Sequence, residues 1–135
     1  MKKYLCLVVL VLFFWSEPQT QELRNASGEL IGRFSGSEYR DSSGKLIYRV
    51  GNDGTVRDAS GALKLRVSGD EFRTASGQLL GRLKNEEVRN SSGRLLGRIQ
   101  DNGDVRNASG QLLGRSRSQN KKQVAVVYFF MQEVI

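Results

Sequence analysis

Apolar and polar residues alternate over short stretches of this chain, and the same alternation returns at a nearly fixed interval. A ten-residue unit occurs six times, at Arg24–Arg33, Arg40–Arg49, Arg57–Arg66, Arg73–Arg82, Arg89–Arg98 and Arg106–Arg115. The Ser-Gly pairs inside successive units are 16 or 17 residues apart. A short period combined with alternation every second residue predicts an array of β-hairpins.

Each unit predicts two strands joined by a tight turn. An Asn or Asp opens this turn in five of the six units, as Asp41 does in the second, and a Gly such as Gly44 closes it in all six. A short polar side chain suits the first position of a type I turn, and Gly suits the fourth. The second strand follows directly after this turn.

The residues of the second strand alternate in polarity. Leu30, Gly32 and Phe34 are predicted to share one face of this strand in the first unit. Ile31 and Arg33 are predicted to share the opposite face, because successive side chains of a strand point to opposite sides. The equivalent residues of the other units follow the same pattern.

The second turn of each repeat varies in length. The two 17-residue steps contain the longer turns, GNDG at 51–54 and QDNG at 100–103. The extra residue is therefore absorbed in a loop and the strand register is kept. About twelve short antiparallel strands are expected. We expect them to close into a ring or barrel, because the end repeats lack the polar faces that an open array needs.

The first twenty residues have the features of a secretory signal. Lys2 and Lys3 precede an apolar run from Leu5 to Trp15, and Pro18 follows it. The run of 11 residues is short for a membrane span, which needs about 20. Residues 1–20 are therefore predicted to be a signal peptide, with a signal anchor as the alternative, and the mature chain 21–135 to be a single exported domain, periplasmic or extracellular.

The end of the chain belongs to no repeat. Residues 22–118 contain the repeats, residues 119–123 are predicted to be a polar linker, and Val124–Met131 is strongly apolar. At this length the apolar segment cannot span a membrane. Apolar on all sides, it is expected to be buried. We predict that residues 124–135 form a plug along the axis of the ring, helical by position, although the β-branched and aromatic residues leave a strand open.

Composition restricts the chemistry that this chain can perform. The sequence has no His, and its one Cys, Cys6, lies in the predicted signal peptide. The mature chain therefore has neither a thiolate nor an imidazole for catalysis or metal binding. The acidic residues lack the spacing of calcium loops. We expect no enzyme activity, no cofactor and no metal site.

The repeated arginines are the candidate binding residues, because equivalent positions in a ring of hairpins line up. The chain carries 21 Lys and Arg against 14 Asp and Glu, a net charge of +7, or +6 without residues 1–20. Two rings are predicted, one formed by Arg33, Arg49, Arg66, Arg82, Arg98 and Arg115, and a second formed by Arg24, Arg40, Arg57, Arg73, Arg89 and Arg106.

These arginines have two interpretations. In the first they form a soluble outer face, with their heads near Asp41, Asp58, Glu71 or Glu87, on a structural or interaction module. In the second they bind an anionic partner, which could be an acidic glycan, phosphate or a lipid headgroup. Nucleic acid is not expected, because aromatic residues do not interleave with the basic ones.

The recurrent strand glycines have two interpretations as well. They either relieve crowding at a bend of the barrel or allow a ligand to approach the backbone closely. The residues concerned are Gly32, Gly81, Gly97 and Gly114.

The repeat unit resembles that of a known family. The unit consists of Arg, Asn or Asp, Ser-Gly, Leu and Gly-Arg, and it repeats at a period near 16 residues. It stands behind a signal peptide and ahead of the tail Val124–Met131. In these features the chain resembles the bacterial β-flower proteins, the five-fold type especially. The resemblance covers residues 22–131 and implies a secreted fold without an assigned activity. Both a five-petalled ring with shared end strands and a six-hairpin barrel fit the spacings. A twelve-stranded barrel around a C-terminal helix is also similar to tubby-like proteins.

Overall fold

Twelve antiparallel strands close into one barrel in the computed structural model, which describes residues 21–118 and 120–131. The strands are β1 (Gln21–Asn25), β2 (Leu30–Ser35), β3 (Glu38–Asp41), β4 (Leu46–Val50), β5 (Thr55–Asp58), β6 (Leu63–Ser68), β7 (Glu71–Thr74), β8 (Leu79–Lys84), β9 (Glu87–Asn90), β10 (Leu95–Ile99), β11 (Asp104–Asn107) and β12 (Leu112–Ser116).

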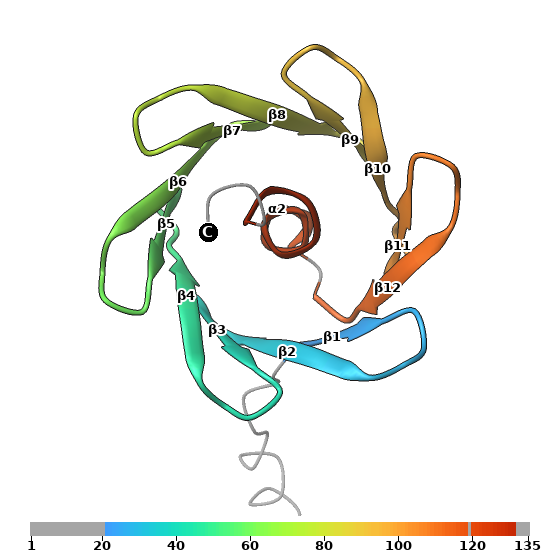
Figure 1. Ribbon diagram of the computed structural model, residues 1–135, viewed down its shortest axis with the longest axis horizontal. Helices are drawn as coiled ribbons and strands as arrows, with labels where there is room; N and C mark the ends of the chain where they lie inside the picture. Colours follow the sequence, from blue (N-terminus) through green and yellow to red (C-terminus); the bar gives the residue numbers. More distant parts are fainter. Residues whose placement is uncertain (1–20, 119, 132–135) are drawn as a thin grey trace, which may run out of the picture.

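The ring closes where the last strand meets the first. Leu23 on β1 lies opposite Ser116 on β12, and Asn25 lies opposite Gly114. Figure 1 shows the six hairpins as six lobes around the centre. The predicted closed all-β ring of repeated hairpins is confirmed, and closure uses six hairpins and not five. The predicted signal peptide lies outside the described residues.

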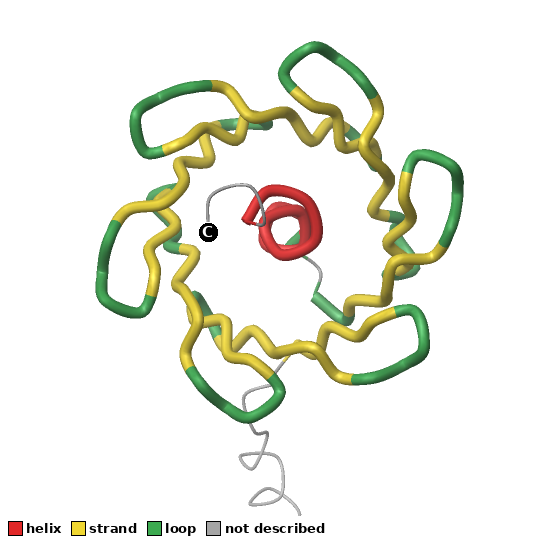
Figure 2. Tube along the Cα trace, in the orientation of Figure 1, coloured by secondary structure: helices red, strands yellow, loops and turns green. Residues whose placement is uncertain are grey.

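The first turn of each hairpin has the chemistry that the sequence predicts. In the first hairpin, the backbone N–H of Gly28 donates to the carbonyl of Asn25 at 3.0 Å, which closes a type I turn. The Asn25 side chain accepts from the N–H groups of Ser27 (3.1 Å) and Glu29 (2.9 Å). Gly28 has φ of +92°, a left-handed conformation that Gly adopts without strain. These turns project outwards from the ring (Figure 2).

A β-bulge in every hairpin changes the predicted alternation. Gly32 lies opposite Leu23, but the next residue of β1, Arg24, lies opposite Leu30, so Ile31 is an extra residue in β2. Ile31 packs against the core and Leu30 does not. The prediction that Leu30 shares the face of Gly32 and Phe34 is therefore wrong. The same shift occurs in the other five hairpins.

The side chains that point into the ring form its core. Each first strand contributes one buried residue, and these are Leu23, Tyr39, Val56, Phe72, Val88 and Val105. Each second strand contributes the residue after its bulge and the residue two positions further on, such as Gly32 and Phe34. Arg33 between them points outwards. Alternation along short strands therefore separates an apolar interior from a charged exterior.

A short helical segment occupies the centre of the ring (Figure 1). It consists of α2 (Lys121–Ala125) and a π-helical turn, η1 (Val126–Phe130). Val124, Val126 and Phe130 are fully buried. The structure confirms a helical plug. Within the described part of the chain, no helix is long and apolar enough to cross a membrane. Residues 132–135 of the predicted plug lie outside the described residues.

The helix begins earlier than the apolar run. Asn120 caps its first turn, since the Asn120 side chain accepts from the N–H groups of Lys122 and Gln123 at 3.1 and 3.3 Å. Residues 121–123 are therefore helical, although the sequence predicts a linker there. Gln123 is buried, and its amide donates to the Gly36 carbonyl at 3.2 Å, which ties the helix to the turn between β2 and β3.

The strand glycines make room for aromatic rings. A Cβ atom at Gly97 would lie 2.7 Å from the ring of Phe129 and would also collide with the Arg106 carbonyl. A Cβ atom at Gly81 would collide with the ring of Phe130, and one at Gly114 would collide with the ring of Tyr128. At Gly32 the space is taken by the ring of Tyr39. All four glycines relieve crowding, in agreement with the first of their two interpretations. The helical segment fits into the ring because Gly81, Gly97 and Gly114 lack side chains.

We expect Phe130→Ala to lower the free energy of unfolding by about 3–5 kcal/mol, since the substitution leaves a cavity in a closed core. The ring of Phe130 is fully buried and stacks on Phe72 with 4.4 Å between centroids. Val127→Ala, at a partly buried site of the same helical turn, is the matched control and should cost less. Chemical denaturation measures both, and equal losses would contradict a specific role for the Phe72–Phe130 stack.

Deleting residues 124–135 should prevent the ring from folding. Burying several large apolar side chains contributes about 10–20 kcal/mol before costs, while a domain is stable by only about 5–15 kcal/mol. The truncated protein should therefore aggregate or melt at a much lower temperature. A soluble truncated chain with an unchanged melting temperature would show that the helix does not hold the ring together.

Candidate functional site

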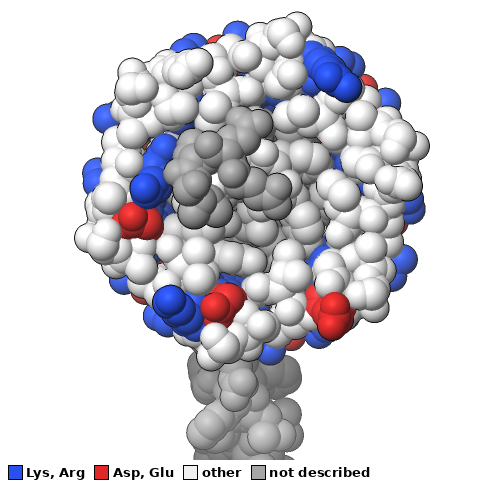
Figure 3. Space-filling view, in the orientation of Figure 1, with Lys and Arg blue, Asp and Glu red and all other residues white. Residues whose placement is uncertain are grey.

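Twelve arginines form a band around the outside of the barrel, which we call the arginine belt. Its members come from the first strands (Arg24, Arg40, Arg57, Arg73, Arg89 and Arg106) and from the second strands (Arg33, Arg49, Arg66, Arg82, Arg98 and Arg115). They point outwards because their neighbours along each strand point into the core. Figure 3 shows Lys and Arg side chains distributed around the circumference of one face.

The strand register merges the two predicted rings into one belt. Arg33 on β2 lies directly opposite Arg40 on β3, and Arg24 lies opposite Arg115 where the barrel closes. The remaining cross-strand pairs are Arg49 with Arg57, Arg66 with Arg73, Arg82 with Arg89, and Arg98 with Arg106. Like charges placed directly opposite each other on a sheet destabilise it, so the belt needs counter-charges.

Carboxylates supply this counter-charge in five hairpins. In the fourth hairpin, Glu71 bridges two arginines: Oε1 lies 2.8 Å from Arg73 and Oε2 lies 2.9 Å from Arg82. Each oxygen thus serves one guanidinium group. The same bridge is made by Glu22, Glu38, Glu87 and Asp104, with distances from 2.8 to 3.6 Å.

The bridges of the four glutamates lower the pKa of these side chains. Hydrogen bonds from Arg73, and then from Arg82, lower the pKa of Glu71. The pKa values of Glu22, Glu38 and Glu87 are lowered in the same way, first of all by the hydrogen bond from the first-strand arginine. A carboxylate held between two arginines with its pKa lowered is poorly suited to donate a proton as a general acid.

The first-strand arginines also hold the hairpin turns. Arg24 Nη1 donates to the Gly28 carbonyl at 2.9 Å. The other five make the same bond to the equivalent turn glycine, at 2.9 to 3.0 Å. Because the donor comes from the strand and the acceptor from the turn, this bond fixes the outward lobe against the belt. The first-strand ring is therefore structural as well as charged.

The acidic partners differ in part from those that the sequence suggests. Glu71 and Glu87 pair with belt arginines as expected, but Asp41 and Asp58 do not. Asp41 caps its own turn, where its Oδ1 accepts from the Ser43 hydroxyl at 2.7 Å and from the Lys45 N–H at 3.0 Å. The hydrogen bond from Ser43 is the largest cause that lowers the pKa of Asp41.

A spacing in the sequence marks the true partners. Residues two apart on a strand share a face, and an acid stands two residues before the first-strand arginine in five hairpins. Glu22 with Arg24 and Glu38 with Arg40 are examples. This acid-x-Arg spacing is the signal in the sequence that identifies the partners, and it also applies to Glu22, Glu38 and Asp104, which were not among the expected partners.

The third hairpin lacks the bridging carboxylate. Thr55 occupies the position of Glu22, opposite Arg66 in the register. Within the described residues, Arg57 and Arg66 are the belt arginines for which no ion pair is formed. Arg57 is exposed, whereas the other first-strand arginines are half-buried. The belt is therefore asymmetric in charge at β5 and β6.

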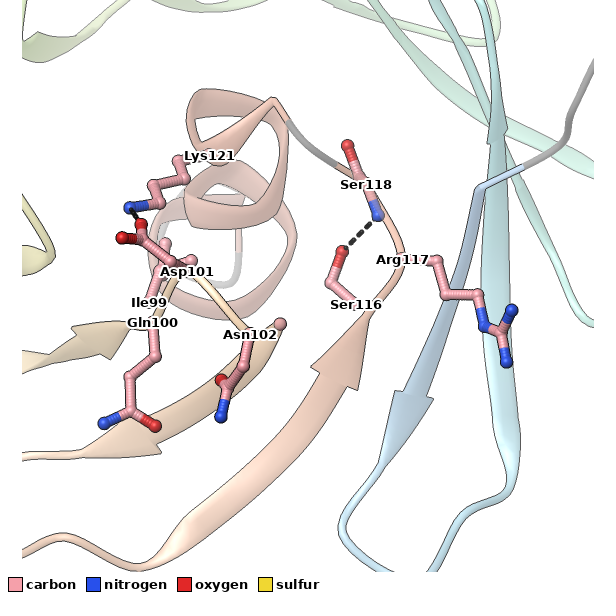
Figure 4. Close-up of a pocket in the computed structure, with 9 residues that line it drawn as sticks. Ile99, Gln100, Asp101, Asn102, Ser116, Arg117, Ser118 and Lys121 are labelled. Atoms are coloured by element: carbon pink, nitrogen blue, oxygen red, sulfur yellow. Dashed lines mark hydrogen bonds and ion pairs between the residues drawn. The ribbon is translucent and has the colours of Figure 1, made fainter.

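A separate cavity of about 720 Å³ lies beside the turn between β10 and β11 (Figure 4). Asp101 and Lys121 form an ion pair at its wall, and the Ser118 N–H donates to the Ser116 hydroxyl at 2.9 Å. Arg117 points away from the ion pair (Figure 4). Because Asp101 and Lys121 neutralise each other and Arg117 points away from them, this cavity is a weaker candidate than the belt. Among the described residues, no cluster of three or more acidic, His or Cys side chains could hold a metal ion.

Acid should destabilise the fold through the belt. The folded-state pKa of Glu71 is lowered, so its contribution to stability is complete above its ordinary pKa of 4.5 and is lost as the pH falls through the lowered value. We expect the melting temperature to fall as the pH decreases below about 4.5, and Glu71→Gln to reduce this fall. Asp70→Asn, at a residue that makes none of the ion pairs of the belt, is the control. Identical pH profiles for Glu71→Gln and the unaltered protein would contradict this role.

Comparison with known proteins identifies the fold family. A family model described as "5-fold beta-flower protein" matches residues 20–132. No curated protein and no solved structure matches the chain. The match spans the barrel and its central helix, although the barrel of this chain has six hairpins. The chain therefore belongs to the 5-fold beta-flower protein family.

Proposed function

We propose that this protein is an exported, non-catalytic interaction module that binds an anionic polymer, an acidic glycan in chemical class, through its arginine belt. The observation that carries the proposal is the distribution of charge. The belt has twelve arginines and five carboxylates and so a net charge of +7, whereas residues 21–135 together carry +6. The charged residues of this segment outside the belt therefore sum to −1.

The curvature of the belt favours a polymer over a membrane. The arginines follow the circumference of a closed ring, and neighbouring strands lie about 4.8 Å apart. A flexible linear polyanion can follow this curve and meet several guanidinium groups in succession. A flat bilayer would touch only part of the circumference. Guanidinium groups bind sulfate, phosphate and carboxylate groups in planar, charge-assisted pairs.

Export and the lack of catalysis are parts of the same proposal. Lys2, Lys3 and the apolar run Leu5–Trp15 support a secretory signal. The engagement of the belt carboxylates by arginines supports a role in binding and not in proton transfer.

A purely structural module is the second candidate, and one observation favours it. Ten of the twelve belt arginines already have a carboxylate partner in the described structure. Exposed ion pairs of this kind contribute little to stability, so their main effect would be to make the outer surface soluble. Binding experiments separate the two candidates.

The mature protein, residues 21–135, should bind dextran sulfate at low ionic strength and release it above about 0.5 M salt, where exposed charges are screened. Neutral dextran is the control and should not bind. Vesicles of phosphatidylglycerol test the membrane as the alternative partner, and stronger binding to vesicles than to dextran sulfate would overturn the choice of a glycan. Binding to neither anionic probe would leave the structural module as the function.

A further inference from the structure

The third hairpin presents two belt arginines without the carboxylate that bridges their counterparts elsewhere. In the other five hairpins, one carboxylate oxygen faces the first-strand arginine and the other faces the second-strand arginine, as Glu38 does with Arg40 and Arg49. The third hairpin has Thr55 at this place, between Arg57 and Arg66. A threonine side chain is shorter than a glutamate and carries no charge.

Neighbouring charges do not fill this gap. The Thr55 hydroxyl donates to Asp53 Oδ1 at 2.7 Å, and the Thr55 N–H donates to the same oxygen at 3.1 Å. These hydrogen bonds are the main causes that lower the pKa of Asp53, and the charge of Arg57 makes the smallest contribution. Asp53 is therefore engaged by Thr55, and it forms no ion pair with Arg57 in the described structure.

The cross-strand neighbours add positive charge at the same place. Arg57 lies opposite Arg49, and Arg66 lies opposite Arg73. The partners of these two neighbours, Glu38 and Glu71, each already bridge two arginines within their own hairpins. Four arginines therefore span β4 to β7, and among residues 21–118 and 120–131 no carboxylate forms an ion pair with the middle two. Repulsion between like charges across a sheet is relieved when an anion binds between them.

We propose that Arg57 and Arg66 form a binding site for one oxyanion group, a sulfate or phosphate, which takes the place of the missing carboxylate. The five carboxylate bridges show what such a ligand must provide, namely two oxygens that each accept from one guanidinium group. This site rests on the proposed function, since it is the place on the belt where a sulfated or phosphorylated polymer would be anchored.

An NMR titration with inorganic phosphate, and separately with sulfate, tests the site on the mature protein. The side-chain Nε–H signals of Arg57 and Arg66 should shift on titration, while those of Arg82 and Arg98 should remain in place. Thr55→Glu supplies the carboxylate of the other hairpins and should weaken oxyanion binding about tenfold or more, because it removes the free charge pair. Its melting temperature should equal or exceed that of the unaltered protein, which checks the fold.

Glu87→Thr is the matched control, because it removes a bridging carboxylate and copies the third hairpin into the fifth. It should create a second site, seen as new phosphate-dependent shifts of Arg89 and Arg98. The double substitution Arg57→Gln and Arg66→Gln should abolish binding at the original site. Uniform shifts of all belt arginines, or an unchanged phosphate affinity in Thr55→Glu, would overturn the proposed site.

The outcomes separate this site from the proposed function. If dextran sulfate binds the unaltered protein and Thr55→Glu equally well, the belt binds polyanions but the third hairpin is not their anchor. If dextran sulfate does not bind while phosphate shifts Arg57 and Arg66, the site exists and the polymer-binding function is wrong.

Discussion

The structure depends on the packing of one helical segment inside the ring that the hairpins close. None of the hairpins can bury its inner face alone, and their inward residues are completed by Val124, Val126 and Phe130. The contact is specific because Gly81, Gly97 and Gly114 leave space for aromatic rings at three even-numbered strands. On the other side of the ring, Tyr48 and Leu65 stand where these glycines would be and fill the interior themselves. The repeats therefore differ at this position according to whether the helical segment packs against them.

Because side chains alternate along each strand, the regular spacing of the core residues also fixes the spacing of the residues on the outer surface. A residue that follows a core position must point outwards, so a regular core produces a regular exterior. Arg33, for example, stands between buried Gly32 and buried Phe34. The belt arises from this geometry, and the carboxylates two residues before the first-strand arginines balance most of it. The excess of positive charge that remains is what a diffusing polyanion would meet first.

Much of the fold could be predicted from the sequence, because the hairpin signals are local and repeated. Residues close together in the sequence determine the turns, the number of strands and the loop that contains the extra residue of the 17-residue steps. The β-bulge could not be predicted, since a strict alternation pattern contains no sign that Ile31 is an extra residue. The start of the helix was also missed, because Asn120 acts as a cap only in view of the chain that follows it.

The candidate site was predictable in outline only. The two arginine rings follow from the repeat, but their merger depends on the register between hairpins, such as Arg33 opposite Arg40. Thr55 becomes informative only when the role of Glu22, Glu38, Glu71, Glu87 and Asp104 is known. The absence of an acid at Thr55 can be interpreted only after the role of the acid in the other five hairpins is understood.

The closure of β12 on β1 has a consequence for how such a chain can change in evolution. The bore of a barrel widens with the number of its strands, so duplication of one hairpin would enlarge the central channel and loss of one would narrow it. The aromatic rings of the helical segment lie against Gly97 and Gly114, so the fit of this segment depends on the width of the ring. A gain or loss of one hairpin would therefore require a matching change in the bulk of the C-terminal segment.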